Sequence, residues 1–230
     1  MLTISELWAS RSEREWDSAL DNYWSVPSVH KNLEIEERMH TIDFAVMKRL
    51  GERKWFEFLE DEYFPWKFTG NWLPRRLADL NSNGRSHLFG VKETLFALSE
   101  TDLANTRKAL STVKSPKIRG LGYAGGSGLL AVLFPKWFGT ADKFVVKGLC
   151  QIPELPERQE LLLMIRTDSR GKESVLLNEK EVVLLVQIMR RKAIELSTIF
   201  NAKWTPRMVD MILWATRDRE EARCSGRTTS

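Results

Sequence analysis

The chain has 230 residues, a formal net charge of +4 and 43% apolar residues. A chain of this length buries a sizeable core, as one large domain or as two small ones. No apolar run approaches the roughly 20 residues that span a bilayer, and the N-terminus lacks the basic-then-apolar pattern of a signal peptide. We therefore expect a cytoplasmic protein without a membrane partner.

Ligands for a metal ion or a disulfide framework are scarce. Cys150 and Cys224 are too few for a disulfide framework or for a four-cysteine cluster site. His30, His40 and His87 show no mutual spacing of the kind found in metal sites. We predict that the chain binds no catalytic metal.

Apolar residues recur at helical spacing along most of the chain, and no segment shows convincing two-residue alternation. We expect an all-α protein with about nine or ten helices. The expected helices cover Ser12–Tyr23, Leu33–Leu50, Glu52–Glu62, a segment from Asn71 to Leu80, Leu88–Leu98, Thr101–Val113, Gly125–Phe134, Arg158–Arg166, Glu179–Asn201 and a last helix that starts at Thr205-Pro206.

The expected loops set the domain organisation. The aromatic segment Tyr63–Trp72 and the polar run Thr167–Lys172 are predicted loops, because Pro65 and Gly70 interrupt the first and polar residues fill the second. Residues 1–218 are expected to form a single unit, or two helical subdomains with a pocket between them. Residues 219–230 are predicted to be a disordered polar tail.

The segment Lys117–Leu149 holds seven of the thirteen glycines of the chain. Gly120-Leu121-Gly122-Tyr123-Ala124-Gly125 matches the pattern G-x-G-x-x-G, and Asp142 lies downstream. A dinucleotide-binding turn needs a buried strand directly before it. The residues before Gly120 are charged and interrupted by Pro116, so the sequence disfavours this interpretation.

A helix-hairpin-helix is the better interpretation. The expected helix Thr101–Val113 leads into the turn Ile118–Gly122, and a second helix follows over Gly125–Phe134. Glycines permit a tight turn, and the amides at the start of the second helix suit a phosphate oxygen. The residues expected to bind the DNA backbone are Lys117, Arg119, Gly120, Gly122, Tyr123, Gly125 and Lys136.

Downstream of this hairpin come Phe138-Gly139-Thr140-Ala141-Asp142 and then Phe144-Val145-Val146. Together these residues resemble the core of the helix-hairpin-helix DNA glycosylase superfamily. Asp142 follows Gly122 by twenty residues, as in that superfamily, and the resemblance covers about a fifth of the chain. The segment Trp204–Trp214 is similar to small bacterial proteins that resemble 8-oxoguanine glycosylases.

The resemblance implies that a nucleotide is flipped out of double-stranded DNA before its base is removed. Asp142 is then the catalytic carboxylate that stabilises the sugar cation and activates water, and its place at a helix N-terminus favours the ionised form. The alternative role of Asp142 is an ordinary helix N-cap. The two roles are compatible.

Many relatives that also cut the DNA backbone carry a lysine in the hairpin. This chain has Tyr123, Ala124 and Gly125 there, and it lacks the cysteines of an iron–sulfur loop. The resemblance therefore implies a monofunctional, monomeric glycosylase that leaves an abasic site. No cofactor is expected, except that the hairpin is a candidate site for a structural monovalent cation.

Base recognition is less specified by the sequence. The candidate walls of the base pocket are aromatic, with core packing as the alternative for each: Tyr63, Trp66, Trp137, Phe138 and Trp214. Gly125, Gly126 and Gly128 either leave room for a bulky base or let helices pack closely. Arg75-Arg76 and Arg190-Arg191-Lys192 are solvated surface or phosphate contacts, and Asn81–Arg85 is a candidate for the wedge that fills the gap left by the flipped base.

Three functions remain open. The first is removal of a damaged or modified base, either in base-excision repair or in defence against phage DNA that carries modified bases. The second is a non-catalytic hairpin that only binds DNA. The third is a structural or interaction protein that has kept the fold and lost DNA binding.

Overall fold

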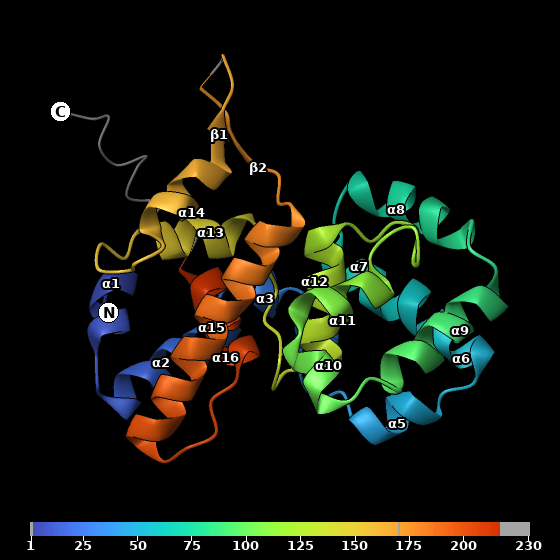
Figure 1. Ribbon diagram of the computed structural model, residues 1–230, viewed down its shortest axis with the longest axis horizontal. Coiled ribbons are helices and arrows are strands. Elements are labelled where there is room, and N and C mark those ends of the chain that lie inside the picture. Colours follow the sequence, from blue (N-terminus) through green and yellow to red (C-terminus); the bar gives the residue numbers. More distant parts are fainter. Residues whose placement is uncertain (1, 170, 217–230) are drawn as a thin grey trace. The chain divides into compact units, whose positions relative to one another are not determined.

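The computed structural model describes residues 2–169 and 171–216, and the expected tail at 219–230 lies outside them (Figure 1). The described residues form helices α1 to α16, one π-helical segment, η1, and a two-stranded antiparallel sheet. They fall into two compact units. Unit 1 combines the chain up to Lys31 with the chain from Ala141 onward, and unit 2 is Asn32–Thr140.

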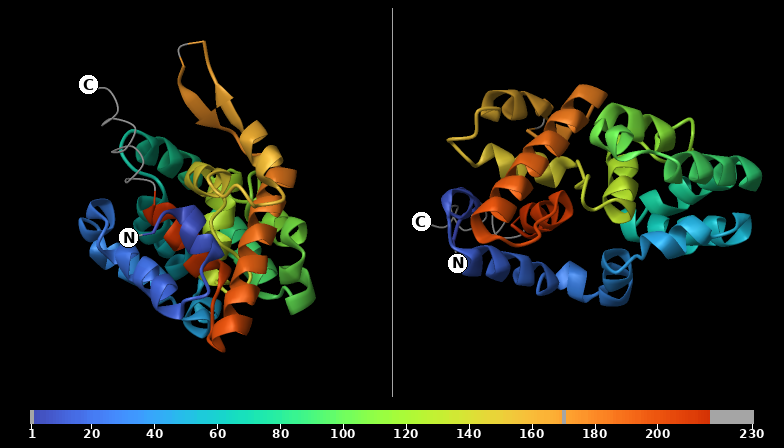
Figure 2. Two further views of the ribbon diagram at one scale, coloured as in Figure 1. Left: turned by 90° about the vertical axis from the view of Figure 1, so that its left-hand side faces the viewer. Right: turned by 60° about the horizontal axis from the view of Figure 1, so that its bottom comes forward.

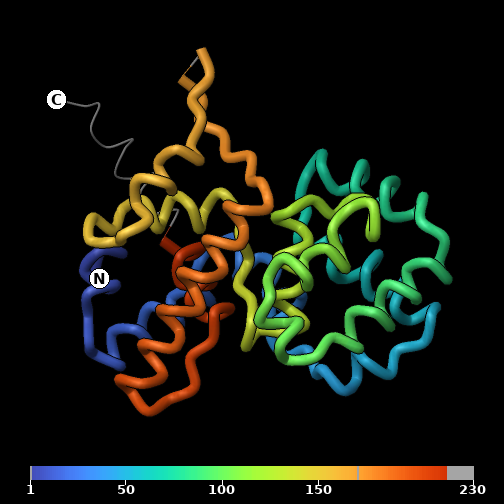
Figure 3. Tube along the Cα trace, in the orientation of Figure 1, coloured from blue at the N-terminus to red at the C-terminus, as the bar shows by residue number. Residues whose placement is uncertain are grey.

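Unit 1 brings the N-terminal helices together with the C-terminal ones, as the blue, orange and red segments show in Figure 3. Its elements are α1 (Ile4–Ala9), α2 (Glu13–Trp24), α3 (Pro27–His30), α13 (Lys143–Cys150), α14 (Arg158–Met164), β1 (Ile165–Thr167), β2 (Glu173–Val175), α15 (Glu179–Phe200) and α16 (Pro206–Ala215). Helix α16 is central, because α2, α13 and α15 all pack against it.

The two C-terminal helices form where their caps predict. Asn178 accepts the N–H of Glu181, whose carboxylate accepts the N–H of Asn178, and this capping box starts the long helix α15 seen beside α16 in Figure 2. The helix ends at Asn201, which has a left-handed φ of 50°. Thr205 then caps α16 and Pro206 opens its first turn.

Unit 2 contains the predicted hairpin. Its elements are α4 (Leu33–His40), α5 (Phe44–Arg49), α6 (Glu52–Glu57), η1 (Phe58–Tyr63), α7 (Phe64–Lys67), α8 (Trp72–Asn81), α9 (Arg85–Phe96), α10 (Glu100–Ala104), α11 (Thr106–Val113) and α12 (Tyr123–Leu133). Every residue of α12 from Gly125 to Leu133 is buried, so this helix forms the centre of the unit. A helix that is apolar on all sides belongs in a core.

The glycines of α12 allow neighbouring elements to approach closely. A Cβ atom on Gly126 would lie 3.2 Å from the Leu110 side chain, and one on Gly128 would lie 2.9 Å from the Tyr63 hydroxyl. Gly125 is equally confined, by Leu121 and Phe68. Of the two interpretations of these glycines, close helix packing is therefore the one that the structure supports.

Several expected helices are interrupted, so the count of nine or ten is wrong for the described residues. Asp43 accepts the N–H groups of Ala45 and Val46 and starts α5, which divides the expected helix Leu33–Leu50. Ser99 and Asn105 cap α10 and α11, which divides Thr101–Val113. A side-chain cap competes locally with helix continuation, and a periodic apolar pattern does not reveal it.

One expected loop and the end of one expected helix are also corrected. The segment Tyr63–Trp72 is largely helical at its start, because α6 continues through η1 into α7 and Pro65 occupies the first turn of α7. A proline is tolerated in the first turn of a helix. The expected helix Arg158–Arg166 stops at Met164, and Ile165–Thr167 pairs with Glu173–Val175. No described helix is long and apolar enough to cross a membrane.

Candidate functional site: a glycine hairpin and a helix-capping aspartate

The turn between α11 and α12 is closed by backbone hydrogen bonds. The N–H of Ser115 donates to the carbonyl of Leu121 at 2.8 Å, and the N–H of Leu121 donates to the carbonyl of Ile118 at 3.1 Å. The side chains of Ile118 and Leu121 are fully buried. The turn is therefore anchored to the core of unit 2 by two apolar side chains, while Lys117, just before Ile118, and Arg119, just after it, are exposed.

Gly120 and Gly122 differ in whether the fold requires a glycine at their positions. Gly120 has a φ of +94°, and a Cβ atom there would lie 3.0 Å from both the Arg76 carbonyl oxygen and the Phe64 ring. The fold therefore requires glycine at this position. Gly122 has an ordinary φ of −77° and is exposed, and a Cβ atom there would meet nothing within 4 Å. The fold does not require glycine at Gly122.

The start of α12 offers amides and positive charge. Gly122 is the N-cap residue and supplies no capping side chain, and the first amides of a helix have no acceptor within it. The N-terminus also carries partial positive charge. The Lys114 ammonium lies 4.4 Å from the Tyr123 ring centroid, so Lys114 adds a cation that the sequence did not single out. This arrangement suits an oxyanion such as a phosphate.

Lys136 does not belong to this end of the helix. It follows the C-terminus of α12, about 16 Å along the axis from the hairpin turn at 1.5 Å per residue. Its ammonium pairs with Glu100 at 3.2 Å and lies 5.1 Å from the Trp137 ring centroid. The expectation that Lys136 adds charge to the hairpin is therefore wrong.

Two side chains outside the hairpin hold its turn in place. The Asn83 side-chain oxygen accepts the N–H of Arg119 at 3.2 Å, and the His87 Nε2 atom lies 2.8 Å from the Lys117 carbonyl oxygen. The Asn83 amide group donates in turn to the Leu80 carbonyl at 2.7 Å. The two contacts with the turn could not be predicted from the sequence, because each joins residues 30 or more positions apart.

The carbonyl oxygens of the turn bear on the expected monovalent cation. Those of Lys117, Ile118 and Leu121 each accept one hydrogen bond from the protein. A carbonyl oxygen has two lone pairs, so these oxygens retain the capacity to ligate a cation. Among residues 2–169 and 171–216, no cluster of three or more metal-binding side chains occurs.

Asp142 begins α13 in unit 1. Its Oδ1 atom accepts the N–H of Phe144 at 2.9 Å and that of Val145 at 3.3 Å. The side chain is half-buried, and the preceding Ala141 is fully buried. The predicted position of Asp142 at the start of a helix is confirmed. The N-cap role, which was the alternative for Asp142, is confirmed as well.

Two of the candidate pocket walls are core residues. Tyr63 is fully buried, its hydroxyl donates to the carbonyl of Gly125, and its ring packs on Phe64 and Trp66. Phe138 is fully buried as well. Neither ring presents an open face to a flipped base, so the structure contradicts their assignment as pocket walls.

The other three aromatic candidates are half-buried. The Trp66 indole N–H donates to Glu36 at 2.8 Å, which fixes its orientation. Trp137 carries the Lys136 ammonium over its ring. The Trp214 ring lies 5.5 Å from the Tyr23 ring and 6.4 Å from the Phe144 ring. Trp214 is therefore the candidate that the structure brings next to the helix headed by Asp142.

Unit 1 also holds a cavity of about 400 Å³, lined by residues of α1, α2 and α16 that include Leu7, Arg14 and Ile212. Neither Asp142 nor Trp214 lines it. This cavity consequently has no link to the candidate catalytic residue.

Comparison of the chain with protein-family models, with curated proteins and with solved structures finds no match. Function therefore has to be inferred from the residues and geometry of this chain.

Proposed function

We propose that the chain is a monofunctional DNA glycosylase, which removes a damaged or modified base from double-stranded DNA. The observation that carries the proposal is the hairpin of unit 2. It combines a required glycine at Gly120, a dispensable and exposed glycine at Gly122, and a helix N-terminus flanked by exposed cations. A glycine that the fold does not need is explained if a partner approaches the backbone there.

In this proposal the hairpin binds the phosphate backbone. The amides at the start of α12 donate to phosphate oxygens, and Lys117 and Arg119 add positive charge. Such contacts position the protein on the duplex without reading its sequence. An enzyme that acts on one kind of base in any sequence context needs contacts of this sequence-independent kind.

Asp142 performs the chemistry. The bond between the sugar C1′ atom and the base nitrogen breaks, the base leaves with the electron pair, and positive charge develops on the sugar. The Asp142 carboxylate stabilises this charge and accepts a proton from the water whose oxygen attacks C1′. The base takes up a proton, and the products are the free base and an abasic site.

Strand cleavage is not part of the proposal. A lyase step needs an amine nucleophile that attacks C1′, and the hairpin positions that carry it in relatives are Tyr123, Ala124 and Gly125. Two classes of substrate are to be tested. One is an oxidised base, and the other is a modified base of the kind found in phage DNA. The first would place the enzyme in base-excision repair and the second in antiviral defence.

A screen of duplexes tests the activity. Each duplex carries one oxidised or modified base, and phage DNA with substituted cytosines is included. After incubation, heating in alkali converts abasic sites into strand breaks, and mass spectrometry identifies the released base. We expect breaks on one substrate class only after alkali treatment. Tight duplex binding with no base released from any substrate would contradict the enzyme.

The capping geometry of Asp142 favours a second function, that of a DNA-binding hairpin protein without catalysis. The contacts of its Oδ1 atom with Phe144 and Val145 account for an aspartate at this position without any chemistry. Under this alternative, asparagine at position 142 caps α13 as well as aspartate does, and DNA binding is unchanged. The two functions therefore differ in the effect of removing the charge while keeping the cap.

A further inference from the structure

The outer face of α8 exposes an indole beside a pair of arginines. Trp72 is 60% exposed, which is the largest exposed fraction among the aromatic side chains of the described residues. Arg75 follows at the next position of the same face and is also exposed, whereas Arg76 is half-buried. The inward face of the helix carries Leu80, which is fully buried. Folding of unit 2 does not account for the exposed indole.

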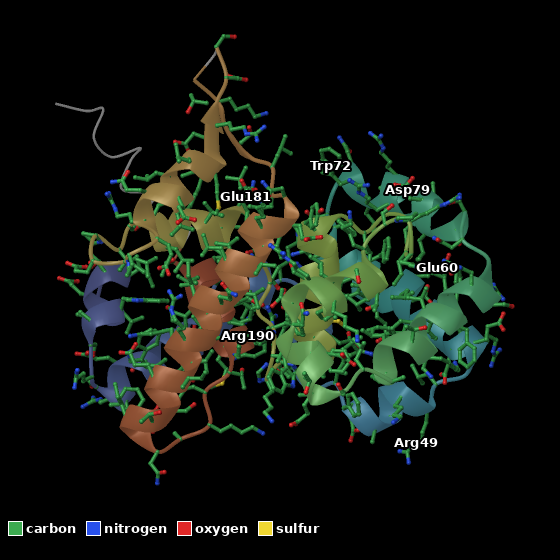
Figure 4. The ribbon with its side chains drawn as sticks, viewed as in Figure 1. Arg49, Glu60, Trp72, Asp79, Glu181 and Arg190 are labelled. Carbon is green, nitrogen blue, oxygen red and sulfur yellow. The ribbon has the colours of Figure 1, made fainter. Side chains whose placement is uncertain are left out.

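This face adjoins the hairpin turn at the C-terminal end of α8. A Cβ atom on Gly120 would lie 3.0 Å from the Arg76 carbonyl oxygen and 3.3 Å from the Asp79 side chain. The Arg119 guanidinium lies 3.4 Å from the Ser82 hydroxyl, just beyond the helix. Figure 4 labels Trp72 and Asp79 at the two ends of this face. The face and the turn therefore form one continuous surface of unit 2.

Positive charge dominates the face. Arg76 pairs with Asp79 at 3.2 Å, which compensates the one carboxylate of α8. The Arg76 guanidinium also lies 5.9 Å from the Trp72 ring centroid and 5.8 Å from the Phe68 ring centroid. The Arg76 guanidinium therefore lies within cation–π distance of the indole, and the exposed Arg75 is on the same face of the helix.

We propose that Trp72 and Arg75 bind the sugar–phosphate backbone of the same duplex that the hairpin grips. Arg75 contacts a phosphate, and the Trp72 indole packs on a neighbouring deoxyribose. The charge complementarity of this face and its continuity with the turn favour a polyanionic partner. The proposal rests on DNA binding by the hairpin, and it does not depend on the catalytic role of Asp142.

The dimensions agree with one strand of a duplex. Asp79, which the turn contacts, follows Trp72 by seven residues, or about 10 Å along a helix. Successive nucleotides of one strand advance about 3.4 Å along the DNA axis. With α8 parallel to the strand, Trp72 meets the backbone about three nucleotides from the point where the hairpin turn contacts α8. Stacking of the indole on a base would require unpaired nucleotides instead.

Fluorescence anisotropy with a labelled 20-base-pair duplex tests the proposal. The variants are Trp72→Ala and Arg75→Ala, and the matched control is Arg49→Ala, an exposed arginine of α5 at the far end of unit 2 from α8 (Figure 4). We expect Trp72→Ala to weaken binding on the order of tenfold. Arg75→Ala should lower the slope of log affinity against log salt by about one. Arg49→Ala should change neither quantity.

The outcomes separate this inference from the proposed function. If the unaltered protein binds duplex DNA and both α8 variants bind as the Arg49→Ala control does, the α8 surface is wrong and the hairpin proposal stands. If the unaltered protein binds no duplex even at low salt, both proposals are wrong. A Trp72→Ala variant that loses affinity for single-stranded DNA but keeps its affinity for the duplex would assign the indole to unpaired bases and overturn the inference.

Discussion

The hydroxyl of Tyr63 donates a hydrogen bond to the carbonyl of Gly125 in the first turn of α12. Tyr63 is the last residue of the π-helical segment η1, and the bond joins it to a residue 62 positions along the chain. Insertions of π-helix often occur at functional sites. Here the segment places a buried phenol against the helix that follows the hairpin turn, so Tyr63 supports the start of α12 from inside the core.

Replacing Tyr63 by phenylalanine should therefore loosen the start of α12 without emptying the core. The ring remains, and one hydrogen bond is lost, which lowers the free energy of unfolding by about 0.5–1.5 kcal/mol. Urea denaturation measures this change. Hydrogen exchange should accelerate in the first turn of α12 more than in α15, which lies in the other unit. An unchanged exchange rate in α12 would show that the bond does not hold the hairpin.

The two hairpin glycines should respond differently to alanine. Gly120→Ala forces an L side chain into a φ of +94° and against the Arg76 carbonyl, so unfolding free energy should fall by about 1–2 kcal/mol or more. Gly122→Ala should leave stability within about 0.5 kcal/mol. Its added methyl group stands where the backbone of DNA is proposed to approach. Duplex affinity should therefore fall by about tenfold, or about 1.4 kcal/mol; equal affinity would contradict the proposed grip.

The absence of a hairpin lysine at Tyr123, Ala124 and Gly125 predicts that no covalent intermediate forms. Sodium borohydride traps the Schiff base of a lyase on its DNA, and we expect no trapped complex with any substrate that the enzyme processes. The Lys114 ammonium lies 4.4 Å from the centroid of the Tyr123 ring, which makes Lys114 a candidate amine beside these positions. A trapped complex that disappears in Lys114→Arg would contradict monofunctional chemistry and identify the nucleophile.

Asp102 should make the stability of unit 2 sensitive to acid. The hydrogen bond from Lys108, followed by those from the Ser99 backbone and hydroxyl, lowers the pKa of Asp102 below 3.8. A lowered pKa contributes stability that is present above the unfolded value and is lost as the pH falls through the folded value. The stability difference between the unaltered protein and Asp102→Asn should therefore shrink as the pH falls below about 3.8. A difference that is constant from pH 6 to pH 2 would show that the carboxylate does not contribute.

The sequence predicted the elements that carry strong local signals. The start of the long helix at Glu179, the Thr205-Pro206 start of α16 and the position of Asp142 at the head of a helix all appear as expected. Each signal involves residues within one helical turn, so no tertiary information is needed to recognise it.

The hairpin turn could also be predicted, because its glycines and apolar anchors lie close together in the chain. Its supports could not. Asn83 and His87 contact the turn from α8–α9, and Tyr63 contacts α12 from η1, across at least 30 residues in each case. A polar residue in an expected loop gives no indication of which distant amide it will bond.

The aromatic candidates show a different limit. Tyr63 and Phe138 are candidate pocket walls with core packing as the alternative, and both are fully buried in the core. Trp72 ends the expected aromatic loop Tyr63–Trp72 and has no individual role among the sequence-based expectations, yet its side chain is largely exposed. Aromatic side chains suit a core and a binding surface equally well, and composition does not reveal which of the two a given ring occupies.

The most direct measurement of the central claim compares base release by the unaltered protein and by Asp142→Asn under single-turnover conditions. Asparagine retains a side-chain oxygen that can accept the N–H groups of Phe144 and Val145, so α13 keeps its cap while the negative charge is removed. Matching thermal unfolding and matching duplex affinity would confirm that only the charge has changed.

With a catalytic carboxylate, the rate of base release should fall by about 10²- to 10⁴-fold in Asp142→Asn. Equal rates in the two proteins would contradict the role of Asp142 in catalysis and leave it as the N-cap of α13.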